Sequence, residues 1–411
     1  MTRKKIVLGP IEIAGNTHSL YRSLKDEGKH VTLFLTNFHP HHPPVCIIQK
    51  IDKYISIIHF KPLRRFFRVM ILPLQTIIAL YHIITKDIFI FYFGTSFLPF
   101  YLDLPILKFL NKKMIMVYCG SDSRFALIDG ARVFNLNKNN YIRICNRNIS
   151  RLKIVEKYVN TILANPFSSQ LHQKEIINIL NIGIPYTAER AVDYQSEIDS
   201  PIKILHCPSD LQAKGTFVIR KVIEKLKQQF DIEYIELSGV PHSEVKQALV
   251  NADCVIDQLY SDQPIPGFAT EAMNFGKPVF IGSYAKTLMK DYVEFSLDCI
   301  ILFNPDEFER VLYQYLNDTT QLKQVSQKAL DHCNNYLNNK TIANNWINII
   351  NDNYPTHWKI TPQDVDYFYG AGLSKEYLKK KINELDVNWD LINLPKEHKL
   401  IQFLKRIKLK T

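Results

Sequence analysis

The chain has 411 residues, of which 46% are hydrophobic, 12% aromatic and 22% charged. The length exceeds the size at which one core keeps growing, so two domains are expected, and the composition excludes wholesale disorder. The formal net charge of +11 indicates an anionic partner: nucleic acid, an anionic membrane surface or a phosphorylated small molecule.

The basic residues are concentrated near the N-terminus, since residues 1–70 contain twelve Lys and Arg against four Asp and Glu. They form neither a recognisable recognition helix nor a stacking platform, so we expect no nucleic-acid partner. The seven cysteines are scattered without a C-x-x-C pair, which favours a reducing cytoplasm. We therefore expect a cytoplasmic protein, with peripheral contact at the inner face of the membrane.

Short apolar strands alternate with helical stretches along most of the chain, the pattern of parallel βαβ units. The first unit is a strand at 6–8, a glycine-containing loop at 9–16 and a helix that ends at Gly28. Its start has too short an apolar run for a signal peptide. Further strands are predicted at 31–35, 88–93, 114–119 and 161–164. A polar stretch at 187–200 then ends a Rossmann-like N-terminal domain, residues 1–186.

One stretch, residues 69–84, is nearly all apolar but contains Pro73, Gln75 and His82. It is shorter than the roughly 20 residues that span a bilayer, so we predict a buried helix. Residues 61–68, just before it, interleave arginines with aromatic residues. That composition suits the headgroup zone of an anionic leaflet, or a solvated turn.

A second βαβ series predicts a C-terminal Rossmann-like domain, residues 201–350. Its strands are expected at 202–206, 234–238, 254–257 and 278–281, with a helix at 217–229. Residues 351–411 have no such rhythm and end in a basic amphipathic run. They are predicted to form a helical extension that docks on the N-terminal domain or lies on lipid.

The most informative motif is residues 264–279, in which a glycine-bearing loop leads into a short helix. Free N–H groups and the positive end of the helix dipole make such a start a site for phosphate. Glu271 is placed in the first helical turn, where its carboxylate can accept hydrogen bonds from ribose hydroxyls. The alternative is a helix with an acidic first turn and no ligand.

A second motif runs from His206 to Thr216 and contains Lys214 and Gly215. Lysine at this place can neutralise a departing diphosphate, and the glycine lets the backbone come close. Taken alone, the motif fits a solvated loop lysine as well, and His206 fits a structural role as well as contact with a donor.

These two motifs, together with the run at 252–259, resemble glycosyltransferase family 4 and its relatives. In the N-terminal half, the loops at 9–16 and 119–124 resemble acceptor-side loops of bacterial cell-envelope members. The resemblance spans roughly residues 5–345. It implies an α/β protein of the GT-B fold, with two Rossmann-like domains facing each other across a cleft and a C-terminal helical extension.

The resemblance also implies roles for individual residues. Candidate catalytic residues are Lys214, Glu271 and Asp122. Donor-binding residues would be Gly15, Asn16, Lys214, Gly215, Gly267, Phe268, Ala269, Thr270 and Glu271. Acceptor-binding residues would be Gly120, Ser121, Asp122 and Arg124. Where many members have a glutamate eight positions before Glu271, this chain has Gln263.

The resemblance implies a retaining, metal-independent hexosyltransferase that uses a UDP- or GDP-linked sugar as substrate and needs no further cofactor. Its acceptor would be a lipid-linked or other cell-envelope glycan, in polysaccharide biosynthesis. The histidines His39, His41 and His42 are set among prolines with no carboxylate close in sequence, so no metal site is predicted there.

Two other functions stay open. A nucleotide-sugar 2-epimerase shares the architecture but needs acid and base carboxylates around the sugar ring, and the sequence indicates no such set. A non-catalytic partner protein of the same fold in envelope glycan assembly is the other alternative.

Overall fold

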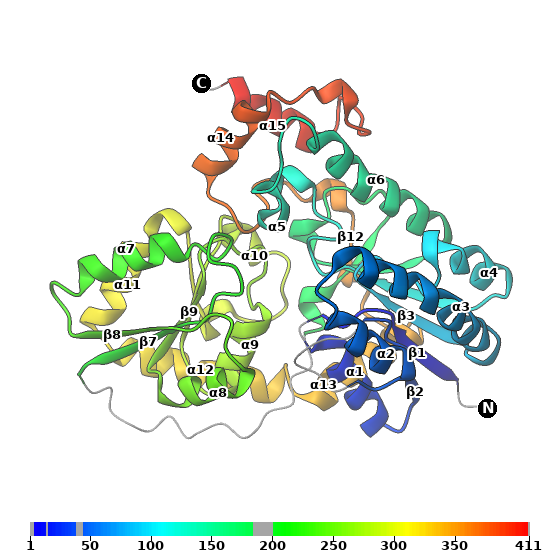
Figure 1. Ribbon diagram of the computed structural model, residues 1–411. Helices are drawn as coiled ribbons and strands as arrows, with labels where there is room; N and C mark the ends of the chain where they lie inside the picture. The colour runs from blue at the N-terminus through cyan, green and yellow to red at the C-terminus, as the bar shows by residue number, and fades with distance from the viewer. Residues whose placement is uncertain (1–3, 14, 38–43, 184–199, 410–411) are drawn as a thin grey trace.

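The computed structural model describes residues 4–13, 15–37, 44–183 and 200–409. It contains two separate sheets, one in each half of the chain, with helices on both faces of each (Figure 1). The predicted α/β class with parallel sheets is therefore confirmed.

The N-terminal sheet has seven strands in the order β12-β6-β5-β4-β3-β1-β2. All neighbouring pairs are parallel except β12 and β6, which are antiparallel. The strands are β1 Lys5–Gly9, β2 His30–Leu33, β3 Ile88–Tyr92, β4 Lys113–Val117, β5 Thr161–Ala164, β6 Ile176–Asn178 and β12 Lys359–Ile360.

Helices cover both faces of this sheet because side chains alternate between the faces along each strand. Helices α2, α3, α4 and α6 pack on the face formed by residues such as Val7 and Phe89, and α1 packs on the face formed by Ile6 and Ile88. The helices of this half are α1 Asn16–Asp26, α2 Ile47–Ser56, α3 Lys61–Thr85, α4 Asp103–Phe109, α5 Gly130–Val133 and α6 Tyr141–Tyr158.

The C-terminal sheet has five parallel strands in the order β11-β10-β9-β7-β8. They are β7 Ile202–His206, β8 Ile232–Glu236, β9 Cys254–Gln258, β10 Val279–Gly282 and β11 Ile301–Phe303. The helices around it are α7 Thr216–Leu226, α8 His242–Asn251, α9 Gly267–Asn274, α10 Lys286–Met289, α11 Phe308–Asn317 and α12 Thr320–Asn335.

The chain then returns to the N-terminal half. Helix α13 (Asn339–Ile350) lies beside α1, and Lys113 on β4 donates to the carbonyl of Ile349 at its end (3.2 Å). Helices α14 (Lys375–Leu385) and α15 (Lys399–Leu409) follow at the top of the molecule in Figure 1. Leu400, Ile401 and Leu404 are buried in the N-terminal core. Of the two predicted placements of this segment, the structure therefore has the one docked on the N-terminal half.

Every predicted strand is present within two residues of its expected ends. The short strands β6, β11 and β12 were not predicted, since two or three residues give no periodicity to detect. The predicted domain limits at 186, 201 and 350 remain predictions.

The helix predicted at residues 69–84 is present, but its predicted burial is wrong. The helix is α3, which has 25 residues because it begins at Lys61 and continues through Pro73, so residues 61–68 are its first turns and not a solvated turn. It is also mostly exposed, with Ile71, Ala79, His82 and Ile83 as its buried residues. By length and composition alone, α3 is long and apolar enough to cross a membrane.

Candidate functional site

The carboxyl ends of the two sheets meet in a cleft between the halves. Arg124, after β4, and Asn165, after β5, both reach Asp262, which follows β9. The Asn165 amide donates to the Asp262 carbonyl (2.7 Å). Ligands of open α/β sheets bind outside the carboxyl ends of strands, so this cleft is the candidate site.

The cleft contains two cavities of about 230 Å³ each, and Gln263 lines both. We call the first the apolar cavity, since its walls include Ile13, Tyr92 and Trp346 as well as Asn16. We call the second the polar cavity, and its walls include Ser121, Asp210 and Lys214. Gln263, eight positions before Glu271, lies where the two cavities adjoin.

Helix α9 begins at the apolar cavity, which Gly267 and Thr270 line. Phe268 is half-buried, and Ala269 is fully buried in the core, so Ala269 can offer a ligand only its backbone. The first N–H groups of a helix have no partner within the helix, so α9 directs such donors toward the cleft.

Lys214 lies on the wall of the polar cavity, at the end of the loop after β7. Its Nζ donates to Asp257 Oδ1 at 2.9 Å, and Asp257 is fully buried on β9. Gly215, next to it, has φ +79° and is the N-cap of α7, and a Cβ there would lie 3.0 Å from Leu259. The backbone bend and the ion pair together fix the ammonium group at the cleft.

Glu271 lies in the second turn of α9, not in the first as predicted, because the helix begins at Gly267. It is buried, and its Oε1 lies 2.7 Å from Nε2 of His242. His242 is the first residue of α8, in the loop region after β8. His242 was not predicted from the sequence, where its position shortly after a strand end is the one signal that marks it.

His206 is structural in this arrangement. It is fully buried, its Nδ1 lies 2.7 Å from the Ile256 carbonyl, and its Nε2 lies 2.9 Å from Thr216 Oγ1. Burial lowers the pKa of His206, which favours a neutral ring that donates from Nδ1 and accepts at Nε2.

At the start of α1, Gly15 takes a left-handed conformation (φ +81°) as N-cap, and Asn16 lines the apolar cavity. The buried carboxylate of Glu12 accepts the backbone N–H of His18 (3.0 Å) and contacts His18 Nδ1. It also accepts the N–H of Thr17 (3.4 Å). Since a carboxylate of the protein already occupies this helix start, α9 is the better site for a phosphate.

In the loop after β4, the residues predicted to bind the acceptor lie close to one another around Arg124. Ser121 lines the polar cavity, and its Oγ donates to Asp129 Oδ1 (3.0 Å). The buried Arg124 donates to Asp129 Oδ1 (3.0 Å) and, from the other half, to Asp262 Oδ2 (3.1 Å). Gly120 packs against this guanidinium. Burial lowers the pKa of Arg124, but Asp262 and then Asp129 outweigh it and leave the pKa raised.

Asp122 is buried and accepts the backbone N–H groups of Cys119 (2.9 Å) and Gly120 (2.8 Å). Burial raises its pKa to about 7 in spite of these hydrogen bonds. Asp122 therefore exchanges a proton near neutral pH. It shapes the loop whose other members line the polar cavity.

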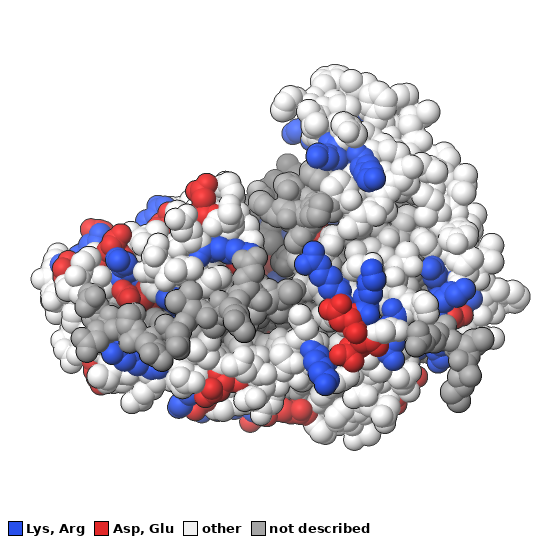
Figure 2. All heavy atoms as spheres, turned by 90° about the horizontal axis from the view of Figure 1, so that it is seen from below, with Lys and Arg blue, Asp and Glu red and all other residues white. Residues whose placement is uncertain are grey.

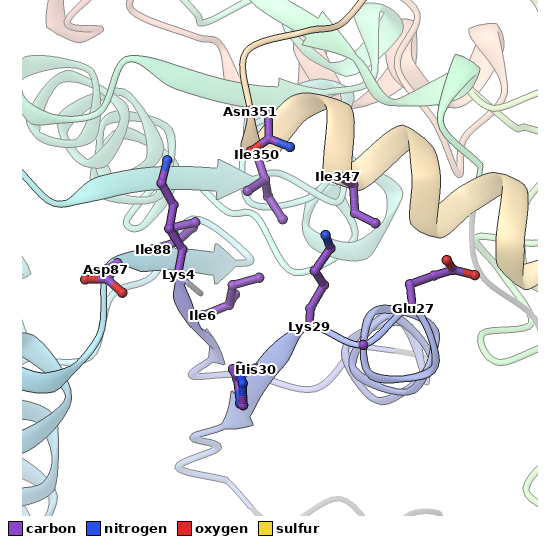
Figure 3. Close-up of a pocket in the computed structure, with 11 residues that line it drawn as sticks. Lys4, Ile6, Glu27, Lys29, His30, Asp87, Ile88, Ile347, Ile350 and Asn351 are labelled. Atoms are coloured by element: carbon purple, nitrogen blue, oxygen red, sulfur yellow. The ribbon is translucent and has the colours of Figure 1, made fainter. Parts of the chain in front are cut away.

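A larger cavity, of about 900 Å³, lies elsewhere. Figure 3 shows it between the starts of β1, β2 and β3 and helix α13, with the side chain of Lys29 extending toward α13. It is at the amino ends of the strands, the edge opposite to the one where ligands of such sheets bind. Its position therefore does not suit a ligand site of this fold.

Within the described residues, no group of three or more His, Cys, Asp or Glu side chains is placed to hold a metal ion. His39, His41 and His42 lie outside the described residues.

Two α/β halves whose parallel strands face each other across a cleft define the GT-B fold, and the predicted architecture is confirmed. Sucrose-phosphate synthase from Thermosynechococcus elongatus shares it, with a TM-score of 0.50 and 14% identity over 85% of this chain and 99% of that one. HepE from Anabaena, in complex with UDP and glucose, has a TM-score of 0.50 and 12% identity over 85% and 100%. At such identities the likeness is one of fold. No protein-family model and no curated protein matches the sequence.

Proposed function

We propose that this chain is a glycosyltransferase that binds a UDP- or GDP-linked sugar in the cleft and transfers the sugar to a lipid-linked or other cell-envelope glycan. The observation that carries the proposal is the pairing of Lys214 with the start of α9 on either side of Gln263. A cation and a helix N-terminus that border adjoining cavities suit a diphosphate and the sugar attached to it.

In this proposal the C-terminal half holds the nucleotide. The start of α9 binds the phosphate, and Glu271, oriented by His242, accepts hydrogen bonds from the ribose. Lys214, oriented by Asp257, stabilises the negative charge that grows on the departing diphosphate. The HepE structure of the same fold was solved with UDP and glucose, which supports a nucleotide-sugar donor here.

The N-terminal half would meet the acceptor through the loop from Gly120 to Arg124. Asp122 would act on the acceptor indirectly, since it is buried and orients this loop by accepting the backbone N–H groups of Cys119 and Gly120. We further propose the outcome implied by the resemblance to family 4, a retaining hexosyl transfer in which the departing phosphate helps to deprotonate the acceptor. The site of action would be the cytoplasmic face of the membrane.

Calorimetric titration with UDP-sugars and GDP-sugars tests the donor site. Because a charge-assisted hydrogen bond contributes about 1.5–3 kcal/mol, Lys214→Ala should weaken the affinity at least tenfold. Glu271→Gln should weaken the binding of nucleotide sugars and of free nucleotides alike, since a neutral amide replaces the charged carboxylate that accepts from the ribose.

The matched controls are Lys221→Ala and Glu224→Gln, which change exposed residues on α7 of the same half. They should bind as the parent protein does. If the parent protein binds no nucleotide sugar, the donor site is wrong and the non-catalytic alternative takes its place. If Lys214→Ala and Lys221→Ala have the same effect, the role of Lys214 is wrong.

A further inference from the structure

The exposed apolar side chains of this protein are gathered on one part of the surface. Of the 27 large hydrophobic residues exposed within the described part of the chain, 20 lie between residues 45 and 110. They belong mainly to α2, α3 and α4, which pack into the same core on one face of the N-terminal sheet. Soluble proteins rarely expose a continuous apolar patch of this extent unless something binds there.

Helix α3 presents this patch along its whole length. One side carries Ile71, Ala79 and Ile83, which are buried against the sheet. The opposite side is exposed at positions spaced by three or four residues: Phe66, Val69, Met70, Pro73, Ile77, Leu80, Tyr81 and Ile84. A helix fixed to the sheet by one side and apolar on the other is suited to lie along an apolar surface and not across it.

An apolar groove of about 450 Å³ extends the patch between α3 and α2. Ile51, Ile55 and Ile58 line it from the α2 side, and Phe67, Met70 and Leu74 line it from α3. Phe66 and Phe67 pack edge to face beside it, with ring centroids 5.7 Å apart. The groove has room for acyl-chain-like groups, and its walls are apolar on both sides.

Charge identifies the occupant. Residues 44–86 contain seven Lys and Arg and one acidic residue, Asp52, which is buried and bonded to Arg68 (3.0 Å). Lys61, Arg64 and Arg65 border the apolar patch in the first turns of α3. Elsewhere the signs are mixed: at the left and along the lower edge of the face in Figure 2, Lys and Arg lie beside Asp and Glu. An apolar strip edged by cations alone fits the interfacial zone of an anionic bilayer.

We propose that α2, α3 and the tip of α4 form a docking surface for an anionic phospholipid bilayer, with α3 lying in the plane of the interface. Phe109, which is 84% exposed at the end of α4, would add a further apolar anchor. Lys61, Arg64 and Arg65 contact lipid phosphates, while Phe66, Met70 and Ile77 enter the boundary between headgroups and acyl chains.

This orientation would bring the cleft close to a lipid-linked acceptor. That link between the docking surface and the acceptor rests on the proposed function. Helix α3 ends at Thr85, just before β3 begins at Ile88, so its last turn lies at the amino edge of the sheet. With 25 residues it is roughly 37 Å long, and its basic first turns therefore reach the carboxyl edge, where the cleft lies. In Figure 1 the start of α3 points toward the C-terminal half. Docking would place the cleft beside the membrane surface.

Co-sedimentation of the full chain with lipid vesicles, without nucleotide or acceptor, tests the surface. One set of vesicles is phosphatidylcholine alone and the other contains roughly one third phosphatidylglycerol. The parent protein should bind the anionic vesicles, and high salt should release it. Each basic residue near an anionic surface contributes about fivefold in affinity, so a Lys61→Gln, Arg64→Gln, Arg65→Gln variant should bind at least tenfold more weakly. Arg68 is left in place because it pairs with Asp52.

A matched control removes the same charge from exposed lysines of the C-terminal half, with Lys221→Gln, Lys290→Gln and Lys323→Gln. It should bind as the parent protein does. A second variant, Phe66→Ser with Met70→Ser, keeps every charge and should also lose binding, whereas Phe217→Ser with Val250→Ser in the C-terminal half should not. Circular dichroism verifies that each variant is folded.

Four outcomes would overturn the proposal. The first two are no binding to anionic vesicles and equal losses of binding in the surface and control variants. The third is retention on the membrane after high salt and alkaline extraction, which indicates a spanning helix. The fourth is a dimer in sedimentation that the Phe66→Ser, Met70→Ser variant abolishes. Donor titration without lipid is independent of all four, so failure of the docking surface and failure of the proposed function are distinguishable.

Discussion

Among the residues of the cleft, Asp122 gives the sharpest test, because its pKa is about 7 in the folded chain against an ordinary value of 3.8. Between these values the folded state keeps a proton that the unfolded state loses, so stability falls as pH rises from about 4 to about 7 and is then level. The shift corresponds to up to about 4 kcal/mol, since one pKa unit is worth about 1.4 kcal/mol.

We therefore expect the free energy of unfolding of Asp122→Asn, relative to the parent protein, to rise steadily from pH 5 to pH 7. Urea unfolding at pH 5, 6, 7 and 8 measures it, with Asp331→Asn on the exposed side of α12 as the control. The comparison of Asp122→Asn with the parent protein is needed because buried His82 and His332, both with a pKa of about 4, contribute a pH dependence of the opposite sign. Both proteins contain these histidines, so their contribution cancels in the difference. A difference that stays constant with pH would contradict the buried, protonated Asp122.

At the scale of residues, the sequence predicted side chains that line the cavities but not the partners that hold those side chains in position. Lys214, Gly267 and Ser121 stood in motifs and do line the cleft. Their supporting partners, such as His242 and Asp262, are single polar residues in loops. No periodicity marks them, since their contacts join positions 29 and 138 residues apart.

At the scale of elements, the segment 366–373 links the two halves and depends on its glycines. Ala371 exchanges backbone hydrogen bonds with the segment 128–130, and Gly372 donates to the carbonyl of Tyr260 in the other half (2.8 Å). Gly370 has φ +70°, and a Cβ there would lie 1.8 Å from the carbonyl oxygen of Ile128. Gly370→Ala therefore needs the backbone to move, in addition to the left-handed strain of about 1 kcal/mol.

Gly239 is a matched control because it also has φ +70° but nothing lies within 4 Å of a Cβ placed there. We expect Gly239→Ala to lower the free energy of unfolding by about 1 kcal/mol and Gly370→Ala to lower it by at least about 2 kcal/mol more. Denaturant unfolding of both variants measures the difference. Equal losses would mean that the close approach of the two backbones contributes nothing.

Elements were predictable where the apolar pattern reflects the local environment, and not where tertiary context decides. Strands of four or five residues between helices could be predicted as short apolar runs because both of their faces are buried. For α3 the pattern is misleading, because its apolar run predicts a buried helix although the helix lies mostly at the surface. Hydrophobicity records a preference for an apolar environment, and a membrane satisfies that preference as well as a core does.

For the whole molecule, the central question is what holds the two halves together at the cleft. Arg124 lies between Asp129 of its own half and Asp262 of the other, and all three side chains are buried. Removing one partner of such a pair leaves a buried charge poorly compensated, so Asp262→Asn should lower the free energy of unfolding by about 3 kcal/mol. Asp129 limits the loss, because it still neutralises the guanidinium.

A double-mutant cycle of Arg124→Met and Asp262→Asn separates the pair from its surroundings. We expect a coupling of at least about 1.5 kcal/mol, against less than about 1 kcal/mol for the exposed pair Arg310 and Glu307 on the C-terminal half. Any movement that opens the cleft on this side must separate Arg124 from Asp262, so small-angle scattering of Asp262→Asn should show a larger radius of gyration. A coupling no larger than that of the surface pair would mean that the helical extension and the segment 366–373, and not this ion pair, hold the cleft closed.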